Sequence, residues 1–128
     1  MQKFLKISVL LLFCLLMFST INSQTNISFK KVDSLTYSMY KNESWKKLKQ
    51  FSNKTVKNNI DYYYLRMRIG IAYYMTGEYL KAVPHFKRAI HFNSFSEEPY
   101  KYIFYALTFS GRIKEAQVFA KKNEKFLP

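Results

Sequence analysis

Apolar residues recur at spacings of three and four along most of the chain, from Phe29 to Leu127, with short polar interruptions. This spacing is typical of amphipathic α-helices, each of which buries one face. The pattern predicts six helices, with boundaries accurate to about two to four residues. They cover residues 29–40, 44–57, 61–75, 79–92, 97–109 and 113–125.

The boundaries between the predicted helices carry residues that favour turns. Gly77 and Gly111 follow helical stretches, and glycine readily adopts the positive φ with which many helices end. Asn93 and Ser94 precede the next helix, and Pro99 suits its first turn. We therefore expect successive helices to form antiparallel hairpins.

A shift of 34 residues superimposes part of the chain on itself. The superimposed pairs are Ala72 and Ala106, Tyr73 and Leu107, Gly77 and Gly111, Tyr79 and Ile113, and Ala82 and Ala116. Amphipathicity alone does not repeat glycines at one interval, so the pattern favours a structural repeat over a generic six-helix bundle, which is the alternative. A 34-residue period is that of the tetratricopeptide repeat.

One unit, residues 63–96, matches that repeat best. The matching residues, at the family's spacing, are Ile69, Gly70, Tyr73, Gly77, Tyr79, Ala82, Phe86 and Ala89. The chain thus resembles the tetratricopeptide repeat (TPR) family. The resemblance implies small residues where helices pack closely (Gly70, Ala72, Ala82, Ala89) and aromatic residues that fill the space between them (Tyr73, Tyr79, Phe86).

The resemblance weakens on both sides of this unit, and the unit itself departs from the pattern. Arg66 stands where a large apolar residue is usual, and Ser94 where a proline is usual. Residues 97–128 form a partial repeat, and residues 29–62 a degenerate one in which Glu43 falls under Gly77. The family resemblance implies an all-α fold of antiparallel hairpins stacked as a short right-handed α-solenoid across residues 29–128.

In this family the first helix of each hairpin lines a groove that holds a peptide. Here that face would carry tyrosines, methionines and cations, which suit a peptide with some negative charge; the alternative is that many of these residues are core. The expected groove residues are Tyr64, Met67, Arg68, Ile71, Tyr74, Met75, Lys101, Tyr102 and Tyr105, with Asp33, Tyr37 and Tyr40 from the degenerate unit.

Residues 1–23 have the layout of a secretory signal peptide. Lys3 and Lys6 precede an apolar run of about a dozen residues, which is followed by small and polar residues. We expect cleavage, a polar linker at residues 24–28, and a location in the periplasm, in the cell envelope or outside the cell; an uncleaved anchor is the alternative. The only cysteine, Cys14, lies in this leader, so the rest of the chain offers no thiol for a disulfide or a metal.

The chain is basic, with 21 Lys and Arg against 8 Asp and Glu. This excess favours acidic partners such as a protein surface, anionic lipid or nucleic acid, although a biased base composition would also produce it. Residues suited to catalysis are scarce: His85 and His91 are six apart, whereas a metal pair on one helix face needs a spacing of three or four. We expect no enzyme activity, metal or cofactor.

We therefore expect an exported scaffold that binds another protein or peptide. A basic binder of anionic lipid, glycan or nucleic acid is the alternative, without specific recognition of nucleic acid. The sequence shows no polar capping helix after the last repeat. Two further possibilities are therefore a homodimer formed through that end and a chain that represents the front part of a larger type of exported protein.

Overall fold

The computed structural model describes residues 27–127, so the predicted leader lies outside the described residues. The described part is all-α and contains no strand. Its elements are α2 (Phe29–Lys41), α3 (Trp45–Lys57), α4 (Tyr63–Met75), α5 (Tyr79–Phe92), α6 (Glu98–Phe109), α7 (Ile113–Lys122) and the 3-10 helix η1 (Glu124–Phe126). The six predicted helices are confirmed.

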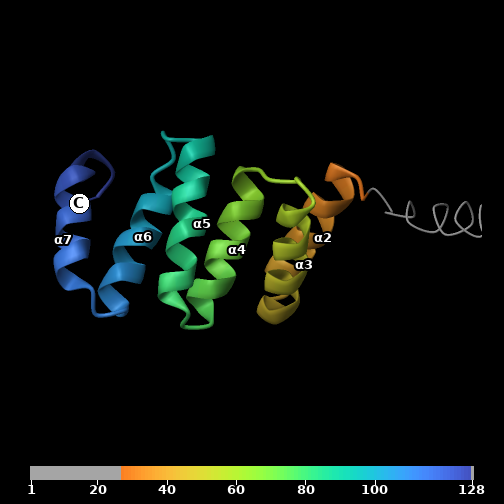
Figure 1. Ribbon diagram of the computed structural model, residues 1–128, viewed down its shortest axis with the longest axis horizontal. Helices are drawn as coiled ribbons and strands as arrows, with labels where there is room; N and C mark the ends of the chain where they lie inside the picture. The colour runs from red at the N-terminus through yellow and green to blue at the C-terminus, as the bar shows by residue number, and fades with distance from the viewer. Residues whose placement is uncertain (1–26, 128) are drawn as a thin grey trace, which may run out of the picture.

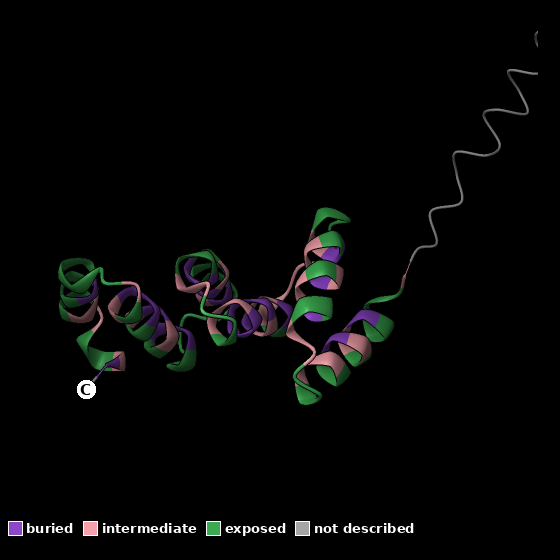
Figure 2. Ribbon diagram, turned by 90° about the horizontal axis from the view of Figure 1, so that it is seen from below, coloured by how far each residue is buried: buried purple, intermediate pink, exposed green. Residues whose placement is uncertain are grey.

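The helices form three antiparallel hairpins that stand side by side in a row, with α2 and α3 at one end and α7 at the other (Figure 1). Each helix packs on the next along the chain, and α2 also packs on α4. The buried residues face neighbouring helices, and the exposed residues face outward (Figure 2). The stacked arrangement of helical hairpins is therefore confirmed.

The turn within each hairpin repeats at 34 residues. Glu43, Gly77 and Gly111 occupy equivalent positions and have positive φ angles of 52°, 75° and 80°. The hydrogen bond that closes the turn also repeats, from Ser44 N to Met39 O, from Glu78 N to Tyr73 O and from Arg112 N to Leu107 O. The first hairpin thus keeps the turn geometry of the others although its sequence has diverged.

Two helix boundaries differ from the prediction for identifiable reasons. Helix α4 begins at Tyr63 and not at Asp61, whose carboxylate instead accepts hydrogen bonds from Arg66 at 2.6 and 2.9 Å. Helix α7 ends at Lys122, where the backbone of Asn123 leaves the helical conformation (φ −124°, ψ 32°) and its side-chain amide donates to the Phe119 carbonyl at 2.8 Å, as a C-terminal cap.

Most of the residues expected to pack between repeats are buried or half-buried, but Gly77 and Gly111, expected among them, are exposed in the turns, where their role is the positive φ. Gly70, Ala72, Ala82, Phe86, Ala89, Ala106 and Ala116 are all buried, and Tyr73 and Tyr79 are half-buried. The tightest contact joins α4 to α5, where a Cβ on Gly70 would lie 2.6 Å from the ring of Phe86. Phe86 also stacks on Tyr102 of α6, with ring centres 4.8 Å apart. One ring thus links three helices.

The short helix η1 covers part of the last hairpin. The ring of Phe126 stacks on Tyr100 of α6 with 4.1 Å between ring centres, and Leu127 is buried. The last repeat, which the sequence led us to expect without a capping helix, is thus covered in part by η1.

We predict opposite stability changes at two equivalent turn positions. Glu43→Gly should stabilise the fold by about 1 kcal/mol, because glycine adopts positive φ without the steric cost that glutamate carries. Gly77→Ala should destabilise it by about 1 kcal/mol for the same reason, since no atom lies within 4 Å of the added Cβ. Urea denaturation of both variants measures the change; two shifts of the same sign would contradict the prediction.

We predict that Gly70→Ala destabilises the protein by about 1–3 kcal/mol, through overpacking against Phe86. Phe86→Leu alone should also destabilise it, by leaving a void. The double variant should lose less stability than the sum of the two single losses, because the smaller leucine side chain at position 86 would leave room for the alanine methyl group at position 70. Simple additivity in a thermal or urea double-mutant cycle would show that the contact is not the cause.

Candidate functional site

The surface formed by α2, α4 and α6, here called the first-helix face, carries the predicted groove residues. Four of the nine are exposed, namely Tyr64, Met75, Lys101 and Tyr105. Tyr37 of α2 and Phe109 of α6 are exposed as well, at 50% and 59%. These side chains are the ones that a ligand on this face would contact.

The prediction is wrong for Met67 and Ile71, which are only 4% and 6% exposed and belong to the main core cluster. Helix α4 packs on α2, α3 and α5, so little of its surface remains open. Tyr40 of α2 and Tyr102 of α6 pack against the same cluster from the two neighbouring hairpins. These rings occupy the space that a groove over α4 would need.

Arg68 lies on the first-helix face but is engaged within the protein. Its Nη1 donates to Asp33 Oδ1 at 2.7 Å and to Thr36 Oγ1 at 2.8 Å, and the hydrogen bond lowers the pKa of Asp33. Its guanidinium carbon lies 5.4 Å from the ring centre of Tyr37 and 5.9 Å from that of Tyr64. Arg68 thus joins α4 to α2 and sits between two exposed tyrosine rings, at cation–π distance from both.

Tyr74 and Tyr102, also predicted to line the groove, are half-buried in an aromatic cluster. The ring centre of Tyr74 lies 5.2 Å from those of Tyr79 and Tyr102, and 6.2 Å from that of Phe109. Burial raises the pKa of both Tyr74 and Tyr102. Their main role is to pack α4 against α5 and α6, and Phe109 is the most exposed member of the cluster.

Arg66, one of the two residues in the unit 63–96 that depart from the repeat pattern, organises a partly buried polar network. It forms a two-point ion pair with Asp61, which also pairs with Arg88 at 3.2 Å. Its Nη1 donates to Nδ1 of His85 at 3.1 Å, and the His85 ring stacks on Tyr73. Burial and the nearby Arg66 cation lower the pKa of His85 to about 4, so this ring is neutral at pH 7.

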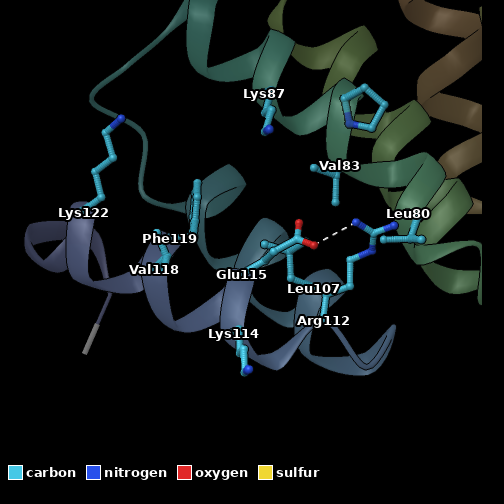
Figure 3. Close-up of a pocket in the computed structure, with 11 residues that line it drawn as sticks. Leu80, Val83, Lys87, Leu107, Arg112, Lys114, Glu115, Val118, Phe119 and Lys122 are labelled. Atoms are coloured by element: carbon cyan, nitrogen blue, oxygen red, sulfur yellow. Dashed lines mark hydrogen bonds and ion pairs between the residues drawn. The ribbon is translucent and has the colours of Figure 1, made fainter.

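The structure contains a hollow that the sequence analysis missed. It lies between α5 and α7, has a volume of about 630 Å³, and is here called the α5–α7 groove (Figure 3). Its apolar lining residues are Leu80, Val83, Pro84, Leu107, Val118 and Phe119, and its charged ones are Lys87, Arg112, Lys114, Glu115 and Lys122. The apolar residues of each helix wall follow a helical spacing, but the sequence alone does not show that the two stripes share one hollow.

Between Ile27 and Leu127, no three His, Cys, Asp or Glu side chains lie close enough together to hold a metal ion. None of the helices in this range has the length and apolar character needed to cross a membrane.

Comparison with protein-family models, curated proteins and solved structures finds no match to this chain. The resemblance to the TPR family therefore stays a prediction from the sequence.

We predict that His85 makes stability depend on pH between about 6.5 and 4. In the unfolded chain His85 has a pKa near 6.5, whereas in the folded chain its pKa is about 4. Between these two pH values the unfolded chain therefore binds a proton at His85 that the folded chain does not bind. The stabilisation is complete above pH 6.5 and is lost as the pH falls, by about 1–2 kcal/mol after allowance for solvent screening. Urea denaturation at several pH values measures this slope.

The two histidines supply a matched control for this prediction. His85→Gln should flatten the slope between pH 6.5 and 4, whereas His91→Gln, which alters an exposed ring, should leave it as in the parent protein. Equal slopes in the parent and in His85→Gln would contradict the assignment.

Proposed function

We propose that this protein is a non-catalytic, TPR-type scaffold that binds a segment of another protein on its first-helix face. The support for the TPR type is the 34-residue period, which the turns at Glu43, Gly77 and Gly111 share in backbone conformation and hydrogen bonding. Three stacked hairpins are about the smallest array that buries a continuous core, so the described residues suit a rigid frame for binding.

The observation that carries the proposal is the pair of exposed tyrosines held around Arg68. Tyr37 and Tyr64 are 50% and 64% exposed, while the guanidinium between them is fixed by Asp33 and Thr36. Exposed tyrosines present a large amphipathic surface at a low cost in conformational entropy, which is typical of protein-binding sites. Arg68 is paired with Asp33 and its side chain is only 11% exposed, so its part is to hold the two rings in place for a ligand.

Tyr105 and Lys101 extend this surface onto the next hairpin. Both are exposed on α6, and Lys101 pairs with Glu97 at 2.9 Å across one helical turn. A peptide lying across α2, α4 and α6 would thus meet tyrosines on each helix. Binding by several first helices at once is what the family resemblance implies.

The proposed setting is the cell envelope or the exterior of the cell. This part of the proposal rests on the leader-like residues 1–23, where Lys3 and Lys6 precede an apolar run.

A second candidate function is electrostatic binding to an anionic lipid, glycan or nucleic acid surface. The observation in its favour is the formal net charge of +13. Binding of that kind weakens steeply with added salt, whereas a complex made through the tyrosines of the first-helix face would depend less on salt.

We predict that a photo-crosslinking residue introduced at Tyr64 or Tyr105 captures the same partner protein in cells that make this protein. The two positions lie on different helices of one face, so a single bound segment reaches both. Gln117, which is exposed on α7, is the control position. Capture of the same protein at Gln117 with equal yield would contradict binding on the first-helix face.

The double variant Tyr64→Ala/Tyr105→Ala should lose this partner in co-purification, by about tenfold or more. Because the rings are 64% and 45% exposed, with Tyr105 stacked on Phe109, the variant should stay folded, with its thermal midpoint lowered by less than about 8 °C. Tyr74→Ala is unsuitable as a test, since removing a ring from the aromatic cluster would alter packing as well as binding.

A further inference from the structure

The α5–α7 groove has two walls and a floor, which come from three helices. Leu80, Val83 and Pro84 of α5 face Val118 and Phe119 of α7, and Leu107 of α6 lies between them. Leu80 and Val118 are 45% and 69% exposed, so this apolar surface is open to solvent. Figure 3 shows Val83 of α5, Leu107 of α6 and Phe119 of α7 around the hollow.

The lining residues of each wall form a single helical stripe. On α5 the stripe runs through residues 80, 83, 84 and 87, and on α7 through residues 115, 118, 119 and 122. This i, i+3, i+4, i+7 spacing is the one with which a helix packs against another helix. Each stripe rises by about 10 Å, which is about two turns of a ligand helix.

The charges around the groove are mostly positive. Lys87, Arg112, Lys114 and Lys122 line it with one acid, Glu115, which pairs with Arg112 at 2.8 Å. Among residues 27–127, no carboxylate forms an ion pair with Lys87, Lys114 or Lys122. Because α5 and α7 run in the same direction, Lys87 and Lys122, which follow the apolar pair of each stripe, lie at the same end of the groove.

The apolar lining of the groove and its positive charge indicate which kind of segment could bind in it. A second copy of the chain carries the same net charge of +13 and would be repelled. Residues 1–26 include Lys3 and Lys6 and no Asp or Glu, so they offer no charge that complements the lysines. An occupant from another protein that carries acidic residues beside apolar ones meets both requirements.

We propose that the α5–α7 groove binds an acidic amphipathic helix of another protein. The helix places a stripe of Leu, Ile or Phe side chains between α5 and α7, above Leu107. Its Asp and Glu residues, at one end of that stripe, lie beside Lys87 and Lys122. This site is separate from the first-helix face, so it stands whether or not that face binds a peptide.

A designed peptide tests the proposal directly with the purified full chain. The peptide is a synthetic helix of about four turns with Leu at i, i+3, i+4 and i+7 and with Glu at one end of that stripe. Fluorescence anisotropy measures its affinity. A matched peptide with Gln in place of every Glu should bind about tenfold more weakly, because it loses the attraction of the lysines.

Two pairs of variants separate this groove from general electrostatic attraction. Val118→Asp should weaken binding about tenfold or more, since it places a polar, anionic group among the leucines; Gln117→Asp, one residue earlier on α7 and outside the groove, should not. Lys122→Glu should weaken binding several-fold more than Lys121→Glu, which makes the same charge change outside the lining. All four sites are exposed, and circular dichroism checks that each variant folds.

Several results would overturn the proposal. One is the absence of binding at millimolar peptide, and another is equal weakening by Lys121→Glu and Lys122→Glu. A third is a dimer in light scattering that Val118→Asp dissociates, which would make the groove a self-interface. A fourth is binding to phosphatidylglycerol vesicles that depends on Val118 while the peptide does not bind, which would assign the groove to lipid. Tyr64→Ala/Tyr105→Ala should bind the peptide as the parent does, which separates this test from that of the first-helix face.

Discussion

The contact of Phe86 with Gly70 determines how closely the central helices approach. Because Gly70 has no Cβ, the Phe86 ring lies where an alanine methyl group would come within 2.6 Å. The same ring stacks on Tyr102, so it also determines where α6 lies relative to α5. In a stack of hairpins each unit is covered only by its neighbours, and a contact shared by three helices therefore connects two units. The alignment of the second and third hairpins depends on it.

The first hairpin is joined to the second by different chemistry. Its apolar cluster contains only three buried residues, Val32, Leu65 and Ile69. Directed polar contacts supplement this cluster, including Arg68 with Asp33 and Lys49 with Glu78. Partly exposed ion pairs contribute modest stability, of about 0–1 kcal/mol each, but an arginine bonded to a carboxylate strongly constrains geometry. The degenerate unit thus keeps its position through polar contacts together with aromatic packing, such as that of Phe29 on Tyr62 with 4.6 Å between ring centres.

The two surfaces of interest arise from the same stack but differ in chemistry. The first-helix face presents tyrosines around a fixed arginine, whereas the α5–α7 groove presents apolar side chains next to Lys87 and Lys122. The first helices and the second helices of the hairpins lie on different sides of the row, so one surface can be occupied without covering the other. A frame of this kind is suited to hold two protein segments at a constant separation.

The sequence by itself determined the helices, the hairpin turns and the 34-residue period, because these follow from local spacing and from the freedom of Gly77 and Gly111 to adopt positive φ. It also identified Gly70 and Phe86 as packing residues. Only the tertiary structure decided that Met67 and Ile71 are core, and that Arg68 is bound to Asp33. The tertiary structure also decided that Val83 and Val118 line one groove. Burial and grooves depend on which residues from distant parts of the sequence come into contact, and the local spacing of apolar residues does not contain this information.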